Sequence, residues 1–123
     1  MQDSIKAVVV HPREKAFIKE IGSSIESLEN LVGESISAFY PFDDHVAIIC
    51  SDNHSLPPNR TILNPEGEAI EVIHGVFAIV GVGDEDYVSL TEEEAEKYKD
   101  MFLFPEKIIN TNGQTKSTKY ETF

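Results

Sequence analysis

Two polar segments of this 123-residue chain carry side chains able to bind a ligand or to take part in catalysis. The first is the aromatic and acidic turn Tyr40-Pro41-Phe42-Asp43-Asp44, and the second is Asn59-Arg60, which follows two prolines. The planar guanidinium of Arg60 suits a carboxylate, a phosphate or a cluster of backbone carbonyls. These residue types predict either a small concave site or a tie between two loops, built from Tyr40, Phe42, Asp43, Asp44, Asn59 and Arg60.

The partner of Arg60 distinguishes these two interpretations. Bidentate hydrogen bonds between arginine and carboxylate are common in protein structures, so a tie between the two loops would pair Arg60 with Asp43 or Asp44. In a binding site, the guanidinium of Arg60 would instead bind a polar ligand. Asp43 and Asp44 could also act as acid and base, but no arrangement of nucleophile and base is recognisable in the sequence. We therefore assign no catalytic residue and expect a non-enzymatic protein.

The cysteine, the histidines and the glycine-rich segment of the chain do not match the patterns of known metal or phosphate sites. The single cysteine, Cys50, lies in the apolar run VAIIC, which excludes an internal disulfide and a cysteine-based zinc site. Gly81-Val82-Gly83 is followed by three acidic residues, which would repel a phosphate. No two histidines have the i, i+4 spacing of a helical zinc motif; they are His11, His45, His54 and His74. We predict neither a metal nor a cofactor.

The charge balance narrows the class of partner. Lys and Arg number 10 and Asp and Glu number 22, which gives a net charge of −12. Binding duplex DNA requires basic residues that neutralise phosphates, so neither nucleic acid nor an anionic membrane is an expected partner. Acidity of this kind usually serves solubility, but it also suits a basic protein partner. The candidate acidic surface comprises Asp84, Glu85, Asp86, Glu92, Glu93, Glu96 and Asp100.

The apolar segments are those of a globular domain. The longest runs are Ala7–Val10, Val46–Cys50 and Val76–Val82, all far shorter than the ~20 residues of a membrane span. The N-terminus lacks the layout of a signal peptide, because charges follow its short apolar stretch directly. We therefore expect the protein to be located in the cytoplasm of a bacterial host cell.

Seven short segments rich in β-branched residues predict strands, and two capping boxes predict helices. The helices start at Ser23-Ser24-Ile25-Glu26 and Thr91-Glu92-Glu93-Glu94. The predicted strands are Ile5–Val10, Ala16–Ile21, Ile36–Tyr40, Val46–Cys50, Thr61–Leu63, Ala69–Ile73 and Val76–Val82.

This order of elements predicts an α+β fold with a mostly antiparallel sheet of five to seven strands and two helices packed on one face. We expect a single domain over residues 1–109. The polar composition of residues 110–123 predicts a flexible tail.

Several of these segments resemble a known family. They are Tyr40–Asp44 with Ala47–Cys50, then Pro58-Asn59-Arg60, Gly75–Gly81 and the helix that opens at Leu90-Thr91. Their order and character are similar to the domain-of-unknown-function 3846 family of bacteria, phages and mobile elements, over roughly residues 5–104. The resemblance carries over no site residues. It implies a small accessory protein encoded by a phage or mobile element.

We expect a small acidic accessory protein that blocks a host factor with a basic surface, as an anti-defence or host-takeover protein would. One alternative is an oligomeric sponge that sequesters a small polar, nucleotide-like signal near Arg60 and the Tyr40 turn. A second is a small-molecule enzyme that uses Asp43 and Asp44. A third is a regulatory domain that docks through a sheet edge.

Overall fold

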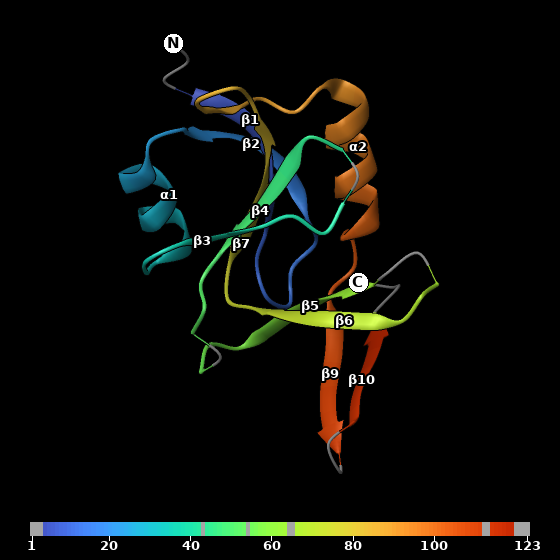
Figure 1. Ribbon diagram of the computed structural model, residues 1–123. Helices are drawn as coiled ribbons and strands as arrows, with labels where there is room; N and C mark the ends of the chain where they lie inside the picture. The colour runs from blue at the N-terminus through green and yellow to red at the C-terminus, as the bar shows by residue number, and fades with distance from the viewer. Residues whose placement is uncertain (1–3, 43, 54, 64–65, 112–113, 120–123) are drawn as a thin grey trace.

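The computed structural model describes the backbone of residues 4–42, 44–53, 55–63, 66–111 and 114–119, and the side chains of these residues as far as Glu106. It contains a six-stranded sheet and two two-stranded sheets (Figure 1). All strand pairs are antiparallel, which confirms the predicted fold class. The main sheet has the order β2 (Phe17–Gly22), β1 (Ser4–Val10), β7 (Phe77–Val82), β4 (Val46–Cys50) and β3 (Ser37–Phe39), and β8 (Tyr87–Val88) pairs with β7.

The three central strands are buried on both faces of the sheet. All five residues of β4 are buried, as are Phe77–Gly81 in β7. Successive side chains of a strand point to opposite faces, so continuous apolar runs make two separate cores. The first core contains Val8, Val10, Val46, Ile48, Cys50, Phe77 and Ile79. The second contains Ile5, Ala7, Val9, Ala47, Ile49, Ala78 and Val80.

Each helix covers one of these cores. Helix α1 (Ile25–Val32) contributes Leu28 and Val32 to the second core, whereas α2 (Glu92–Met101) contributes Ala95 and Tyr98 to the first. The helices therefore lie on opposite faces of the sheet (Figure 1), where we expected them on one shared face. The physical reason is that central strands with apolar side chains on both faces need cover on both.

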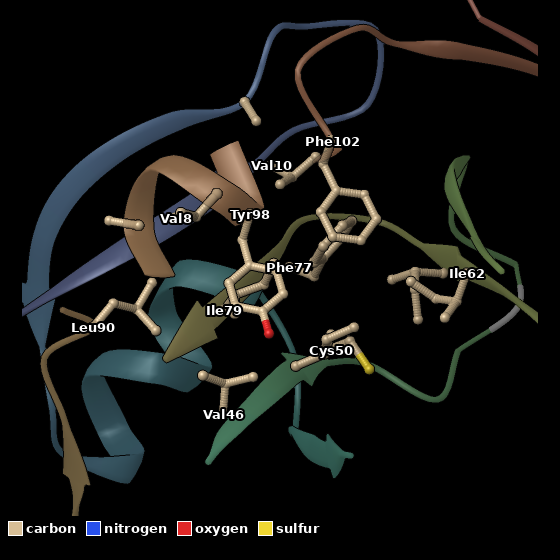
Figure 2. Close-up of a cluster of buried hydrophobic side chains, with 14 residues drawn as sticks. Val8, Val10, Val46, Cys50, Ile62, Phe77, Ile79, Leu90, Tyr98 and Phe102 are labelled. Atoms are coloured by element: carbon tan, nitrogen blue, oxygen red, sulfur yellow. The ribbon is translucent and has the colours of Figure 1, made fainter. Parts of the chain in front are cut away.

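Aromatic rings close the first core. Tyr98 and Phe102 project from α2 and the turn that follows it toward Phe77 and Ile79 (Figure 2). The rings of Phe77 and Phe102 meet edge to face, with centroids 5.5 Å apart. This geometry is favourable beyond the apolar area that it buries, so it helps to hold the end of α2 against the sheet.

The predicted strands Thr61–Leu63 and Ala69–Ile73 are confirmed as β5 (Pro58–Leu63) and β6 (Ala69–His74), which pair with each other. This hairpin adds Ile62 and Ile73 to the first core. A second pair, β9 (Glu106–Thr111) with β10 (Gln114–Lys119), was not predicted. The expected domain boundary at 109 falls within β9.

One signal in the sequence does favour this second hairpin. Asn112-Gly113 is the strongest short-range hairpin dipeptide, and apolar and Thr residues precede it. The scarcity of large apolar residues after Ile109 favoured the interpretation as a polar tail.

The helix caps agree in part with the sequence analysis. The capping box of α2 is confirmed, because Thr91 accepts from the Glu94 amide and Glu94 accepts from the Thr91 amide. At α1 the cap is Ser24 rather than Ser23, since Ser24 Oγ accepts from the Ser27 amide at 3.1 Å. Neither helix is long and apolar enough to span a membrane, and the described part of the chain has no other helix that is.

The Ser24 cap supplies the first testable prediction. Ser24→Ala leaves the Ser27 amide without its acceptor and should lower the free energy of unfolding by about 1 kcal/mol, as cap removal typically does. Ser24→Asp retains an acceptor and serves as the matched control. Urea denaturation of both variants checks the assignment, and equal stability of Ser24→Ala and the wild type would contradict it.

Candidate functional site

Arg60 lies in β5 and is completely buried. Its Nε donates to the carbonyl of Phe102 at 3.1 Å, and one terminal nitrogen donates to the carbonyl of Glu14 at 2.6 Å. The other terminal nitrogen donates to the Asn59 carbonyl at 3.3 Å and to Asn59 Oδ1 at 2.8 Å. The guanidinium thus binds a cluster of neutral oxygens from three separate segments.

Asn59 extends this network to the sheet. Its side-chain amide donates to the carbonyl of Val10, at the end of β1, and to the carbonyl of Gly75, just before β7. The two distances are 2.9 Å and 2.8 Å. Asn59 is 1% exposed, so these bonds form away from water. We call Asn59 and Arg60 together the Asn59–Arg60 clamp.

Burial sets the protonation behaviour of the clamp. Desolvation lowers the pKa of Arg60 to about 10, and the charge of Glu106 opposes this shift. The guanidinium therefore remains charged at neutral pH. Because its donors are turned to protein oxygens in a buried position, it joins segments of the chain through neutral oxygens and not through the expected pair with Asp44.

Asp44 has partners other than Arg60. Its Oδ2 accepts from Lys97 Nζ at 2.9 Å and from the Tyr98 hydroxyl at 2.6 Å. The hydrogen bond from Lys97, followed by that from Tyr98, lowers the pKa of Asp44. Asp44 is thus an ionised anchor between the segment before β4 and α2. Asp43 lies outside the described residues.

The two aromatic candidates separate as well. Phe42 packs against Tyr98, with ring centroids 4.9 Å apart, and is part of the first core. Tyr40 is 60% exposed. The pKa of Tyr87 is raised, first by burial and then by Tyr40, whose hydroxyl shares a hydrogen bond with it. The five described candidates therefore lie in three places: the clamp, the contacts of Phe42 and Asp44 with α2, and the Tyr40–Tyr87 pair.

The candidate acidic surface has all of its side chains exposed. Asp84, Glu85 and Asp86 form the turn between β7 and β8, and the remaining four residues are on α2. The β7–β8 turn and the start of α2 lie at the same end of the sheet (Figure 1), because the Leu90 amide donates to the carbonyl of Lys6 near the start of β1. We call this end the acidic end.

The acidic end belongs to a longer stretch without basic residues. From Thr61 to Glu96 the sequence contains no Lys or Arg. The same stretch contains ten carboxylates: Glu66, Glu68, Glu71, Asp84, Glu85, Asp86, Glu92, Glu93, Glu94 and Glu96. On α2, Lys97 pairs with Asp44 and Lys99 with Glu96 at 3.5 Å, so both lysines have acidic partners.

A polar cluster beyond the end of β4 was missed by the sequence analysis. Glu34 accepts from Ser51 Oγ at 2.7 Å and from Asn53 Nδ2 at 2.9 Å, and these bonds lower its pKa. The cluster joins the segment after α1 to the loop after β4. Residues that are 17 and 19 positions apart carried no motif that could have revealed it.

Metal and thiol chemistry find little support in the described part of the chain. No three His, Cys, Asp or Glu side chains gather there as metal ligands. Cys50 is buried, and desolvation raises the pKa of its thiol to about 11. The thiolate is the reactive form, so this cysteine is a poor nucleophile at neutral pH.

A family model described as a domain of unknown function (DUF3846) matches residues 5–103. Searches of curated proteins and of solved structures found no significant match.

The clamp is testable by substitution of Arg60. Arg60→Met leaves the buried carbonyls of Phe102 and Glu14 without donors, which should cost about 3 kcal/mol or more of unfolding free energy. Arg13→Met removes the other arginine, which is exposed, and should change stability by no more than about 0.5 kcal/mol. Urea denaturation measures both, and similar losses for the two variants would contradict the clamp.

The anchoring role of Asp44 predicts a pH dependence. Its folded-state pKa lies below the ordinary 3.8, so its stabilisation is present above that value and lost as the pH falls through the folded-state pKa. Asp44→Asn should therefore be less stable than the wild type at neutral pH, and the difference should shrink as the pH falls below 3.8. Asp100→Asn removes an exposed carboxylate of the same helix as a control. A difference that did not change with pH would refute the role.

Proposed function

The chain belongs to the DUF3846 family, a domain of unknown function, and from this premise we propose that it is a non-enzymatic binding protein whose acidic end occupies a basic surface of a partner protein. The observation that carries the proposal is the exposure of all seven predicted acidic side chains, on a turn and on a helix that starts at the same end of the sheet. Charges arranged in this way steer association with a partner of opposite sign.

Two tyrosines support a protein partner in particular. Tyr87 directly follows the acidic turn, and Tyr40, which shares a hydrogen bond with it, is largely exposed. Protein interfaces are enriched in tyrosine, which gives rigid contact area at a small entropic cost. An aromatic pair beside exposed carboxylates provides both the anchor and the charge that such an interface needs.

The alternatives receive less support from the contacts of the candidate residues. A sponge for a nucleotide-like signal would use Asn59 and Arg60, but both are buried and bonded to protein oxygens. An enzyme would use Asp44 as an acid or base. Its lowered pKa and its bonds to Lys97 and Tyr98 suit an anchor better than a proton donor at neutral pH.

The biological setting extends the proposal. A protein of this kind, encoded by a phage or mobile element and acting in the bacterial cytoplasm, would block a host factor by covering its basic surface. Host nucleic-acid-binding proteins carry surfaces of this sign, so the blocked step would be one of defence or of host control.

Capture of host proteins at low and high salt tests the proposal. The tagged protein should retain a basic host protein at low salt and release it near 1 M salt, where charges are screened within about 3 Å. Neutralising the turn as Asp84→Asn, Glu85→Gln and Asp86→Asn should weaken binding about tenfold or more. The matched control neutralises Glu20, Glu26 and Glu29, which changes the net charge equally on β2 and α1.

Two results would overturn the proposal. One is equal loss of binding in the turn variant and in the control, which would reduce the effect to net charge. The other is a small molecule that is seen in the native mass spectrum of the protein from its host and disappears on denaturation. That result would favour sequestration of a ligand instead.

A further inference from the structure

The two-stranded sheet of β5 and β6 has two outer edges that differ in how they are covered. In the described part of the chain, β6 pairs with β5 and with no other strand. On the β5 side, β9 lies close and supplies Glu106. On the β6 side, Ala69, Ile70 and Glu71 are exposed to solvent. Among the residues that the structure describes, the edge of β6 is therefore the open one of the two.

Hydrogen bonds show which backbone groups reach this edge. Thr61 and Val72 are directly opposite each other in the register. The Thr61 amide points away from β6, because it donates to Glu106 Oε1 at 3.1 Å. In an antiparallel pair, opposite residues both point toward the partner strand or both point away from it. The Val72 amide and carbonyl thus point outward, and the amide is met by the exposed carboxylate of Glu71 at 3.3 Å.

The side chains around this edge define the kind of occupant. Leu63 and Ile70 are each 50% exposed, although both are large and apolar. Glu68 and Glu71 add negative charge, and the sequence has no Lys or Arg from Thr61 to Glu96. Exposed apolar side chains thus lie beside unpaired backbone groups at the edge of β6, with carboxylates around them. Such an edge complements an extended segment that alternates apolar and basic residues.

We propose that the open edge of β6 binds a basic extended segment of a partner protein by β-strand addition, with main-chain hydrogen bonds to Val72. This goes beyond the proposed function, because β6 lies on the small sheet and away from the acidic end (Figure 1). A second copy of this chain suits the edge poorly. It would bring Glu68 and Glu71 of two copies together in molecules that each carry a charge of −12.

Fluorescence anisotropy with labelled peptides tests the proposal. The probe is a capped peptide of alternating lysine and valine, and the matched peptide replaces each lysine with glutamate. The lysine peptide should bind the wild-type protein at least about tenfold more tightly than the glutamate peptide, since like charges oppose pairing. Val72→Pro removes the outward amide without removing a bond to β5, and should weaken binding about tenfold.

A second probe keeps the test independent of how well Val72→Pro folds. Methylation of alternate backbone nitrogens in the lysine peptide blocks one of its two edges. One methylation phase should abolish binding to the unaltered protein, and the other should leave binding intact, because an added strand uses one edge only. Equal binding of both methylated peptides would overturn strand addition and indicate charge attraction alone.

Two further outcomes separate this inference from neighbouring ones. The variant neutralised at Glu20, Glu26 and Glu29, which lie on β2 and α1, should bind the peptide as the wild type does; a loss equal to that of Val72→Pro would reduce binding to net charge and overturn the β6 site. Analytical ultracentrifugation without peptide should show that the wild-type protein does not self-associate. If the wild type self-associates and Val72→Pro abolishes this, the occupant is a second copy and the proposal of a basic partner segment fails.

Discussion

The buried guanidinium of Arg60 is the interaction on which the arrangement of the segments around the first core depends. It donates to carbonyls of the β1–β2 loop and of the turn after α2. Asn59 donates to the carbonyl of Val10 at the end of β1 and to that of Gly75, just before β7. An unpaired carbonyl in a dry interior is costly, so each of these turns is held in place by the donor that satisfies it. A guanidinium suits this position because its planar set of N–H donors can form hydrogen bonds with several oxygens at once.

A sheet with two buried faces constrains the remainder of the fold. Because β1, β4 and β7 carry apolar side chains on both faces, one helix must cover each face. The first core is the larger of the two, and α2 covers it together with the β5–β6 hairpin. The clamp fastens this hairpin to the end of β1. Asp44 then fixes α2 to the segment before β4 through Lys97 and Tyr98. Polar contacts in this protein therefore position elements that the apolar cores hold together.

This division of roles decides which residues remain for binding. The clamp and Asp44 are engaged by the protein itself, whereas the carboxylates of the β7–β8 turn and of α2 face solvent beside the Tyr40–Tyr87 pair. The binding surfaces that we propose are thus two exposed features, the acidic end and the open edge of β6. Both lie largely in the stretch without Lys or Arg, so under these proposals both would select partners of positive charge.

The sequence by itself determined the local elements and the sign of the surface. Apolar runs such as Val46–Cys50 and the Thr91 capping box depend on neighbouring residues alone, and charged side chains such as those of Asp84–Asp86 stay exposed because burial would desolvate them. Tertiary structure decided the rest: that the helices cover opposite faces, and that Arg60 turns to carbonyls rather than to Asp44. Its oxygen partners Glu14 and Phe102 are 46 and 42 residues away. Backbone carbonyls look alike at every position of a sequence, so only the folded chain shows which of them a buried donor meets.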